Sequence, residues 1–138
     1  MIQYRSILAL SAIFIIPLGY VVRFSSLLPE WFRNAAGNVA YETLLIVLLL
    51  LIFPKVKPIA AALTVCFITF GLEFLQLSQD PVLVAARSNR LGRLILGNSF
   101  NWEDFPLYVL GSLVGWGYAA HIKRSVYGQA SAKPDDLR

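Results

Sequence analysis

Residues 39–77 read VAYETLLIVLLLLIFPKVKPIAAALTVCFITFGLEFLQL, and this stretch decides the fold because two long apolar segments flank the short basic turn PKVKP. A helix needs about 20 mostly apolar residues to cross a bilayer. The first segment predicts a membrane helix over residues 39–53. The second predicts another over residues 58–77, with Pro58 in the first turn, where proline is tolerated. So tight a turn makes the two helices antiparallel neighbours.

Two further apolar segments lie outside this pair. Residues 6–22 are flanked by Arg5 and Arg23, and residues 104–122 are followed by Lys123 and Arg124. Neither segment, nor any other, alternates apolar and polar residues with the period of a strand. The sequence therefore predicts an all-α integral membrane protein, with a four-helix bundle over residues 1–126 and a disordered polar tail over residues 127–138.

The composition excludes several classes of protein. Hydrophobic residues make up 57% of the 138 residues and charged residues 14%, whereas a soluble domain has about 25% charged residues. A soluble or disordered chain is therefore not expected. The single cysteine excludes an intrachain disulfide, and one histidine without a cluster of ligands leads us to expect no metal and no cofactor. The net charge of +4 favours a role in membrane topology, and we expect no nucleic-acid partner.

Basic residues predict the orientation, because cytoplasmic loops carry an excess of Lys and Arg. Five arginines lie on one side of the predicted helices, namely Arg23, Arg33, Arg87, Arg90 and Arg93. Seven basic residues lie on the other side, namely Arg5, Lys55, Lys57, Lys123, Arg124, Lys133 and Arg138. The larger number favours cytoplasmic N and C termini. The five basic residues of the presumed outer side are all arginine. This favours binding of carboxylate or phosphate groups, because the planar guanidinium group matches their geometry.

Two glutamates lie inside the apolar segments, where a charged side chain is costly and often functional. Glu42 and Glu73 lie 11 and 15 residues from the ends of their helices at the turn. At about 1.5 Å per residue, both lie about 16–23 Å from the turn. The two acids are therefore expected in the same half of the membrane.

The two predicted long loops, residues 23–38 and 78–103, emerge on the side of these acids. The second loop mixes arginines with leucines and aromatic residues, which is typical of a re-entrant or interfacial segment. We therefore expect such a segment between the third and fourth helices. The candidate ligand-binding residues are Arg23, Glu42, Glu73, Gln76, Arg87, Arg90, Arg93, Trp102 and Asp104.

Each of these features also has a structural interpretation. The two glutamates can join polar networks between helices, and the loop arginines can anchor the chain at lipid phosphates. Gly111, Gly115 and Ala119 form a small-residue stripe, which permits close helix packing either within the chain or between copies.

The motifs Glu73-x-x-Gln76, Arg87-x-x-x-x-Gly92, Leu96-Gly97-x-x-Phe100-x-Trp102-x-Asp104 and Tyr108-x-x-Gly111 follow one another in this chain. They resemble the family of small bacterial membrane proteins called domain of unknown function 2809, and more distantly the VanZ-like proteins linked to glycopeptide (teicoplanin) resistance. Asn38 departs from the aspartate typical of that position. The resemblance implies the bacterial inner (plasma) membrane and the cell envelope, and no established activity. It marks as motif positions Arg23, Glu73, Gln76, Arg87, Gly92, Gly97, Trp102, Asp104 and Gly111.

Three functions remain open at this point. The first is binding of an anionic lipid or a lipid-linked head group at the outer face, with arginines contacting phosphate or carboxylate. The second is a structural or accessory subunit of a membrane complex, as a homo-oligomer or with a membrane-protein partner. The third is a proton-coupled transporter or intramembrane enzyme that uses Glu73. We expect that the protein is not an enzyme, because the sequence shows no set of catalytic residues such as a nucleophile with its base.

Overall fold

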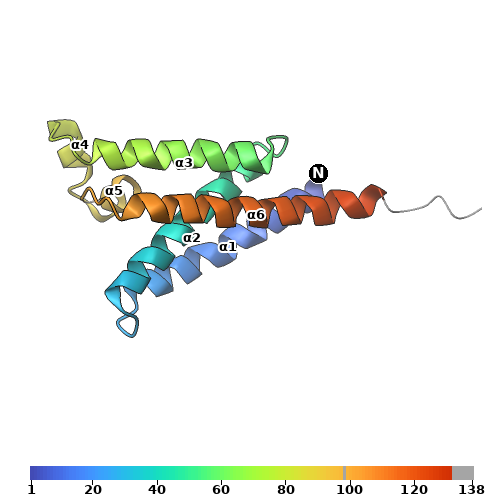
Figure 1. The fold of residues 1–138 in the computed structure, drawn as a ribbon, viewed down its shortest axis with the longest axis horizontal. Coiled ribbons are helices and arrows are strands. Elements are labelled where there is room, and N and C mark those ends of the chain that lie inside the picture. The colour runs from blue at the N-terminus through green and yellow to red at the C-terminus, as the bar shows by residue number, and fades with distance from the viewer. Residues whose placement is uncertain (98, 132–138) are drawn as a thin grey trace, which may run out of the picture.

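The computed structural model describes residues 1–97 and 99–131, and within these ranges it contains helices and no strand (Figure 1). In chain order the helices are α1 (Ile2–Phe24), α2 (Glu30–Ile52), α3 (Pro58–Leu75), α4 (Pro81–Ala86), α5 (Arg90–Leu96) and α6 (Asp104–Ser131). The all-helical class predicted from the sequence is thus confirmed.

Three of the described helices, α1, α2 and α3, are long and apolar enough to cross a membrane. Many of their large apolar side chains are exposed, Phe14 and Phe67 among them. Apolar exposure on this scale is rare in soluble proteins, whereas it is what lipid chains contact in a membrane. The fold therefore supports the predicted membrane protein.

The four long helices form two pairs. Figure 1 shows α3 and α6 side by side along the longest axis, and α1 and α2 as a second pair that crosses α6 obliquely. Helix α2 contacts α1, α3 and α6, and so joins the two pairs. The crossing of the two pairs does not confirm the four-helix bundle predicted from the sequence.

Two helix boundaries differ from the prediction. Helix α2 begins at Glu30, next to Pro29, and not at residue 39. Residues 30–38 therefore belong to a helix and not to a loop. Their polar side chains interrupt the apolar stretch from which the helix was predicted, but they do not interrupt the helix itself. Helix α6 continues to Ser131, so residues 127–131 of the predicted disordered tail are helical. The rest of the predicted tail, residues 132–138, lies outside the described residues.

The small-residue stripe on α6 packs inside the chain. A Cβ atom at Gly111 would lie 2.6 Å from the Cβ atom of Glu42, and one at Gly115 would lie 2.6 Å from the Cδ1 atom of Ile46. Ala119 is fully buried in the apolar core. The stripe therefore serves the contact between α6 and α2 within the chain.

The segment between α3 and α6 contains the short helices α4 and α5. Both lie at the end of the molecule where α3 ends and α6 begins (Figure 1). Polar side chains start each one: Asp80 Oδ1 accepts a hydrogen bond from the Val82 N–H at 2.9 Å, and Asn89 Oδ1 accepts one from the Gly92 N–H at 2.7 Å. Such caps satisfy backbone donors that a helix start leaves unpaired.

Candidate functional site

Glu73 connects three parts of the chain through its carboxylate. The side chain is 1% exposed. Its Oε1 atom accepts a hydrogen bond from the Asn101 N–H at 2.9 Å, and its Oε2 atom accepts one each from Gln76 Nε2 and the Tyr108 hydroxyl, both at 3.1 Å. Glu73 thus ties α3 to α6 and, through Asn101, to the residues just before α6.

Glu42 lies one helical turn deeper between the same helices. Its Oε1 atom accepts hydrogen bonds from the Ser112 hydroxyl at 2.7 Å and the Thr69 hydroxyl at 3.3 Å. Thr69 precedes Glu73 by one turn, and Ser112 follows Tyr108 by one turn. The acids therefore lie in the same half of the molecule, as the sequence predicts. The Oε2 atom of Glu42 is buried without a hydrogen-bond partner among the described residues.

A glycine at the end of α5 lies against the network around Glu73. Gly97 has a φ angle of +74° and a ψ angle of 173°, a region that other residues rarely adopt. A Cβ atom at this position would overlap the side-chain amide of Gln76, which itself donates to Glu73. The family motif position Gly97 is thus explained by backbone conformation and close packing.

We expect Gly97→Ala to destabilise the protein by about 1–3 kcal/mol, because it combines a strained backbone with a side-chain overlap. Thermal unfolding in detergent measures the effect. Gly71→Ala is the matched control, since a Cβ atom at the exposed Gly71 would contact nothing within 4 Å. Equal midpoints for the two variants would contradict the close packing at Gly97.

Arg87 binds the end of α3. Its Nη2 atom donates to the Leu75 carbonyl at 2.7 Å, and its Nη1 atom donates to the Ser78 carbonyl at 3.4 Å. The last carbonyls of a helix lack partners within the helix, and a guanidinium satisfies them well. The structure therefore places Arg87 as a cap that fixes the turn between α3 and α4.

Arg23 and Asp104 also lie among protein groups. The Nη1 atom of Arg23 donates to Asn34 Oδ1 at 3.0 Å, and Asp104 Oδ1 accepts from Asn38 Nδ2 at 2.9 Å. These bonds join the facing ends of α1, α2 and α6. Asn38, the departure from the family pattern, thus supplies a donor to Asp104 where an aspartate would repel it.

Arg90 and Arg93 differ from the other candidate arginines. Both are exposed on α5, and the structure shows no hydrogen bond from either guanidinium to a described residue. At about 100° per residue, they share one side of α5. Leu91, Leu94 and Ile95, between 51% and 66% exposed, share the adjacent side. Helix α5 therefore presents an arginine face beside an apolar face.

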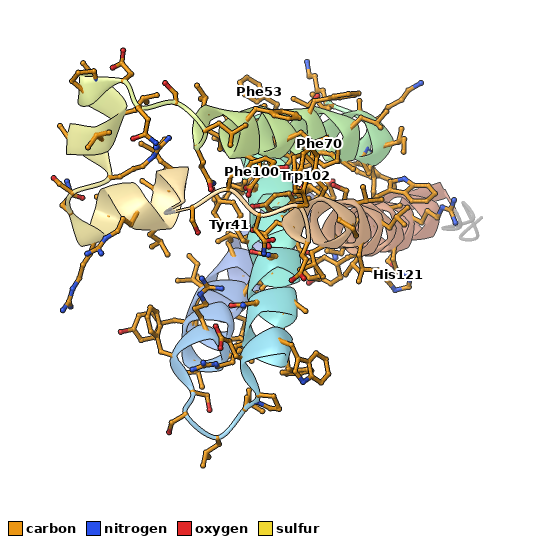
Figure 2. All side chains as sticks on the ribbon, turned by 60° about the vertical axis from the view of Figure 1, so that its left-hand side comes forward. Tyr41, Phe53, Phe70, Phe100, Trp102 and His121 are labelled. Atoms are coloured by element: carbon orange, nitrogen blue, oxygen red, sulfur yellow. The ribbon has the colours of Figure 1, made fainter. Side chains whose placement is uncertain are left out.

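Trp102 belongs to an aromatic cluster at the seam of α3 and α6 (Figure 2). Its ring lies 4.9 Å from Phe100 and 5.5 Å from Phe105, centroid to centroid. Phe74 of α3 packs on Phe105 at 5.4 Å. Trp102 is itself 70% exposed, as suits a side chain at a membrane–water boundary.

The two hydroxyl partners of Glu42 were not identified from the sequence. Thr69 and Ser112 were not among the candidate residues, although Thr69 lies four residues before Glu73, on the same face of α3. That spacing was the available signal. Within residues 1–97 and 99–131, no group of three or more His, Cys, Asp or Glu side chains is placed to hold a metal ion.

Except for Arg23, the candidate site residues lie within the part of the chain that matches a known family. The family model described as Protein of unknown function (DUF2809) matches residues 27–112, which is more than half of the chain. No curated protein and no solved structure is similar enough to match. The matched range includes Glu42, Glu73 and the α4–α5 segment. The chain therefore belongs to the DUF2809 family of proteins of unknown function, the family that its motifs resemble.

Proposed function

We propose that this protein is an integral membrane protein that binds anionic lipid head groups through Arg90 and Arg93 of α5. The observation that supports the proposal is that these two guanidinium groups are exposed and make no hydrogen bond to a described residue, beside exposed Leu91, Leu94 and Ile95. Arg87 has no part in the contact, since it caps α3.

The two faces of α5 suit the surface of a bilayer. Exposed leucines gain free energy by entering the acyl region, at about 25 cal/mol per Å² of apolar area. Guanidinium groups beside them reach the phosphate level, where each forms paired, charge-assisted hydrogen bonds. A helix with these two faces lies in the plane of the interface. The proposal thus keeps the interfacial form of the predicted segment and sets the re-entrant form aside.

Polar contacts at both ends of α5 hold the helix in place. The Tyr41 hydroxyl of α2 donates to the Ile95 carbonyl at 3.4 Å, and Glu73 accepts from the Asn101 N–H beyond α5. Gly92 packs directly on the Ala86 carbonyl at the end of α4. In this proposal Glu73 positions the residues that follow α5, Glu42 joins α2 to α3 and α6, and neither acid carries a proton across the membrane.

The proposal includes a location. With both termini in the cytoplasm of a bacterial cell, as the basic residues favour, α5 faces the outer leaflet of the inner membrane. A lipid-linked head group with a phosphate would meet the same two arginines as a phospholipid. The accessory-subunit function loses its main support, because the stripe of Gly111, Gly115 and Ala119 is occupied within the chain.

Native mass spectrometry of the purified protein tests the proposal. The protein is loaded with equal amounts of phosphatidylglycerol and phosphatidylcholine. We expect the wild type to retain more of the anionic lipid than of the zwitterionic lipid. In the double variant Arg90→Gln with Arg93→Gln, we expect the ratio of the two retained lipids to fall at least about fivefold, since each basic group near a lipid surface contributes about 1 kcal/mol.

Two controls isolate the contribution of α5. Arg5→Gln with Lys55→Gln removes the same charge at the opposite end of the helices, and we expect it to retain most of the preference. Arg87→Gln should lower the thermal midpoint while the lipid preference stays. The proposal fails if the α5 pair and the distant pair change the preference equally, or if the α5 pair leaves it unchanged.

A further inference from the structure

A groove runs along the outer side of the seam between α3 and α6, far from α5. Its apolar part, of about 250 Å³, is lined chiefly by Ala62, Leu63 and Cys66 of α3 and by Val109, Leu113 and Trp116 of α6. From Ile59 to Cys66 the groove follows α3 for about 10 Å. Its shape and lining suit part of one acyl chain.

A second hollow, of about 290 Å³ and lined in part by basic residues, lies beside the groove. Ile59 and Trp116 line both hollows, so the two are adjacent. Three basic residues surround the second hollow, namely Lys57, Lys123 and Arg124. The combined site thus has an apolar channel along the helices and a cationic mouth where α3 begins.

The charges at the mouth are not neutralised by described residues. Lys57 and Arg124 are exposed, and the structure pairs neither of them with a described carboxylate. Lys123 donates to the Val56 carbonyl at 3.2 Å and retains its full charge. The acidic residues that the structure describes lie elsewhere, in α2, in the later turns of α3, between α3 and α4, and at the start of α6. They are Glu30, Glu42, Glu73, Asp80, Glu103 and Asp104.

We infer that this groove is a second lipid site, which binds one anionic phospholipid with its phosphate at Lys57, Lys123 and Arg124 and one acyl chain along α3 and α6. The inference goes beyond the proposed function, since the site lies at the opposite end of the long helices from α5. It also uses Trp116, Lys123 and Arg124, which follow the residues that match the family model.

Charge complementarity favours an anionic phospholipid over the alternatives. A second copy of this chain would bring another set of basic groups to the mouth. A zwitterionic lipid would gain from the apolar channel but little from three cations, since its head group carries no net charge. An anionic head group gains from both parts of the site.

The three tryptophans of the chain supply a direct probe of the groove. Trp31→Phe with Trp102→Phe leaves Trp116, which lines both hollows, as the only tryptophan, and excitation at its long-wavelength edge avoids the tyrosines. The full chain is placed in mixed vesicles that contain either brominated phosphatidylglycerol or brominated phosphatidylcholine. Bromine atoms on an acyl chain in the groove quench Trp116. The dependence of quenching on the fraction of brominated lipid gives the relative affinity of each lipid for the groove. We expect this affinity to be at least about fivefold higher for the anionic lipid than for the zwitterionic lipid.

Charge variants in this background identify the mouth as the source of the preference. Lys57→Gln with Arg124→Gln should bring the ratio of affinities close to one. Arg5→Gln with Lys55→Gln removes two charges at the same end of the molecule, outside the groove, and should leave most of the ratio. A ratio of one in the unmodified background, an unchanged ratio in the first pair, or an equal loss in both pairs would overturn the inference.

Discussion

Glu73→Ala is expected to lower the free energy of unfolding by about 2–4 kcal/mol, the largest of the stability effects that this structure predicts. The carboxylate accepts hydrogen bonds from the Asn101 N–H, Gln76 and the Tyr108 hydroxyl. A buried donor that loses its acceptor costs about 1–3 kcal/mol. The donors around Glu73 that lie near the membrane surface regain part of this free energy by hydrogen bonding to water. Thermal unfolding in detergent measures the loss.

Glu73→Gln is the informative companion of this variant. Its amide oxygen can accept from one set of donors, and its amide N–H can donate to the Oε1 atom of Gln76, which is buried without a partner. We therefore expect less than half of the loss seen with alanine. Glu30→Gln, at the exposed start of α2, controls for the removal of one acidic charge. A Glu73→Ala variant as stable as Glu30→Gln would show that the network around Glu73 contributes little.

Gly111→Ala is expected to destabilise the contact between α2 and α6 by about 1–3 kcal/mol, the usual cost of an overpacked core. Its Cβ atom would lie 2.6 Å from the Cβ atom of Glu42 and 3.2 Å from the Cα atom of Val39. Both neighbours are at or next to the backbone, so neither can rotate away. The two helices must separate, and the Ser112–Glu42 hydrogen bond of 2.7 Å lengthens with them.

Two other glycines of α6 supply the scale for this measurement. At Gly115 the closest atom is the Cδ1 atom of Ile46, the end of a flexible side chain, so Gly115→Ala should cost less than Gly111→Ala. A Cβ atom at Gly117 contacts nothing within 4 Å, and Gly117→Ala should be neutral or stabilising because alanine favours helices. The order of midpoints in detergent, Gly117 above Gly115 above Gly111, is the expected result. Any other order contradicts the packing described here.

The apolar segments were the most predictable part of the fold. Proline at the start of α3 and the PKVKP turn located the α2–α3 hairpin within a few residues. The start of α2 was predicted late because Trp31, Arg33 and Asn34 interrupt the apolar run, whereas a helix continues through polar residues that reach past the lipid. The end of α6 was predicted early for the same reason, at Lys123 and Arg124.

The candidate site was predictable in location but not in the roles of its residues. Helix parity placed Glu42 and Glu73 in one half of the molecule, and the structure agrees. Nothing in the sequence distinguishes Arg87, which caps α3, from Arg90 and Arg93, which are exposed. That difference depends on where the chain turns after Ser78, a long-range property that local residue patterns do not record.

The depth of α5 in the bilayer distinguishes an interfacial helix that binds lipid phosphates from a helix in water. In a Cys66→Ser background, spin labels are attached to single cysteines introduced as Leu94→Cys and Arg93→Cys, and their collision rates with oxygen and with a water-soluble nickel complex are compared in anionic vesicles. The account predicts that the label at residue 94 favours oxygen, as in the acyl region, and that the label at residue 93 favours nickel, as at the phosphates. Equal and high nickel accessibility at both positions would place α5 in water and contradict the account.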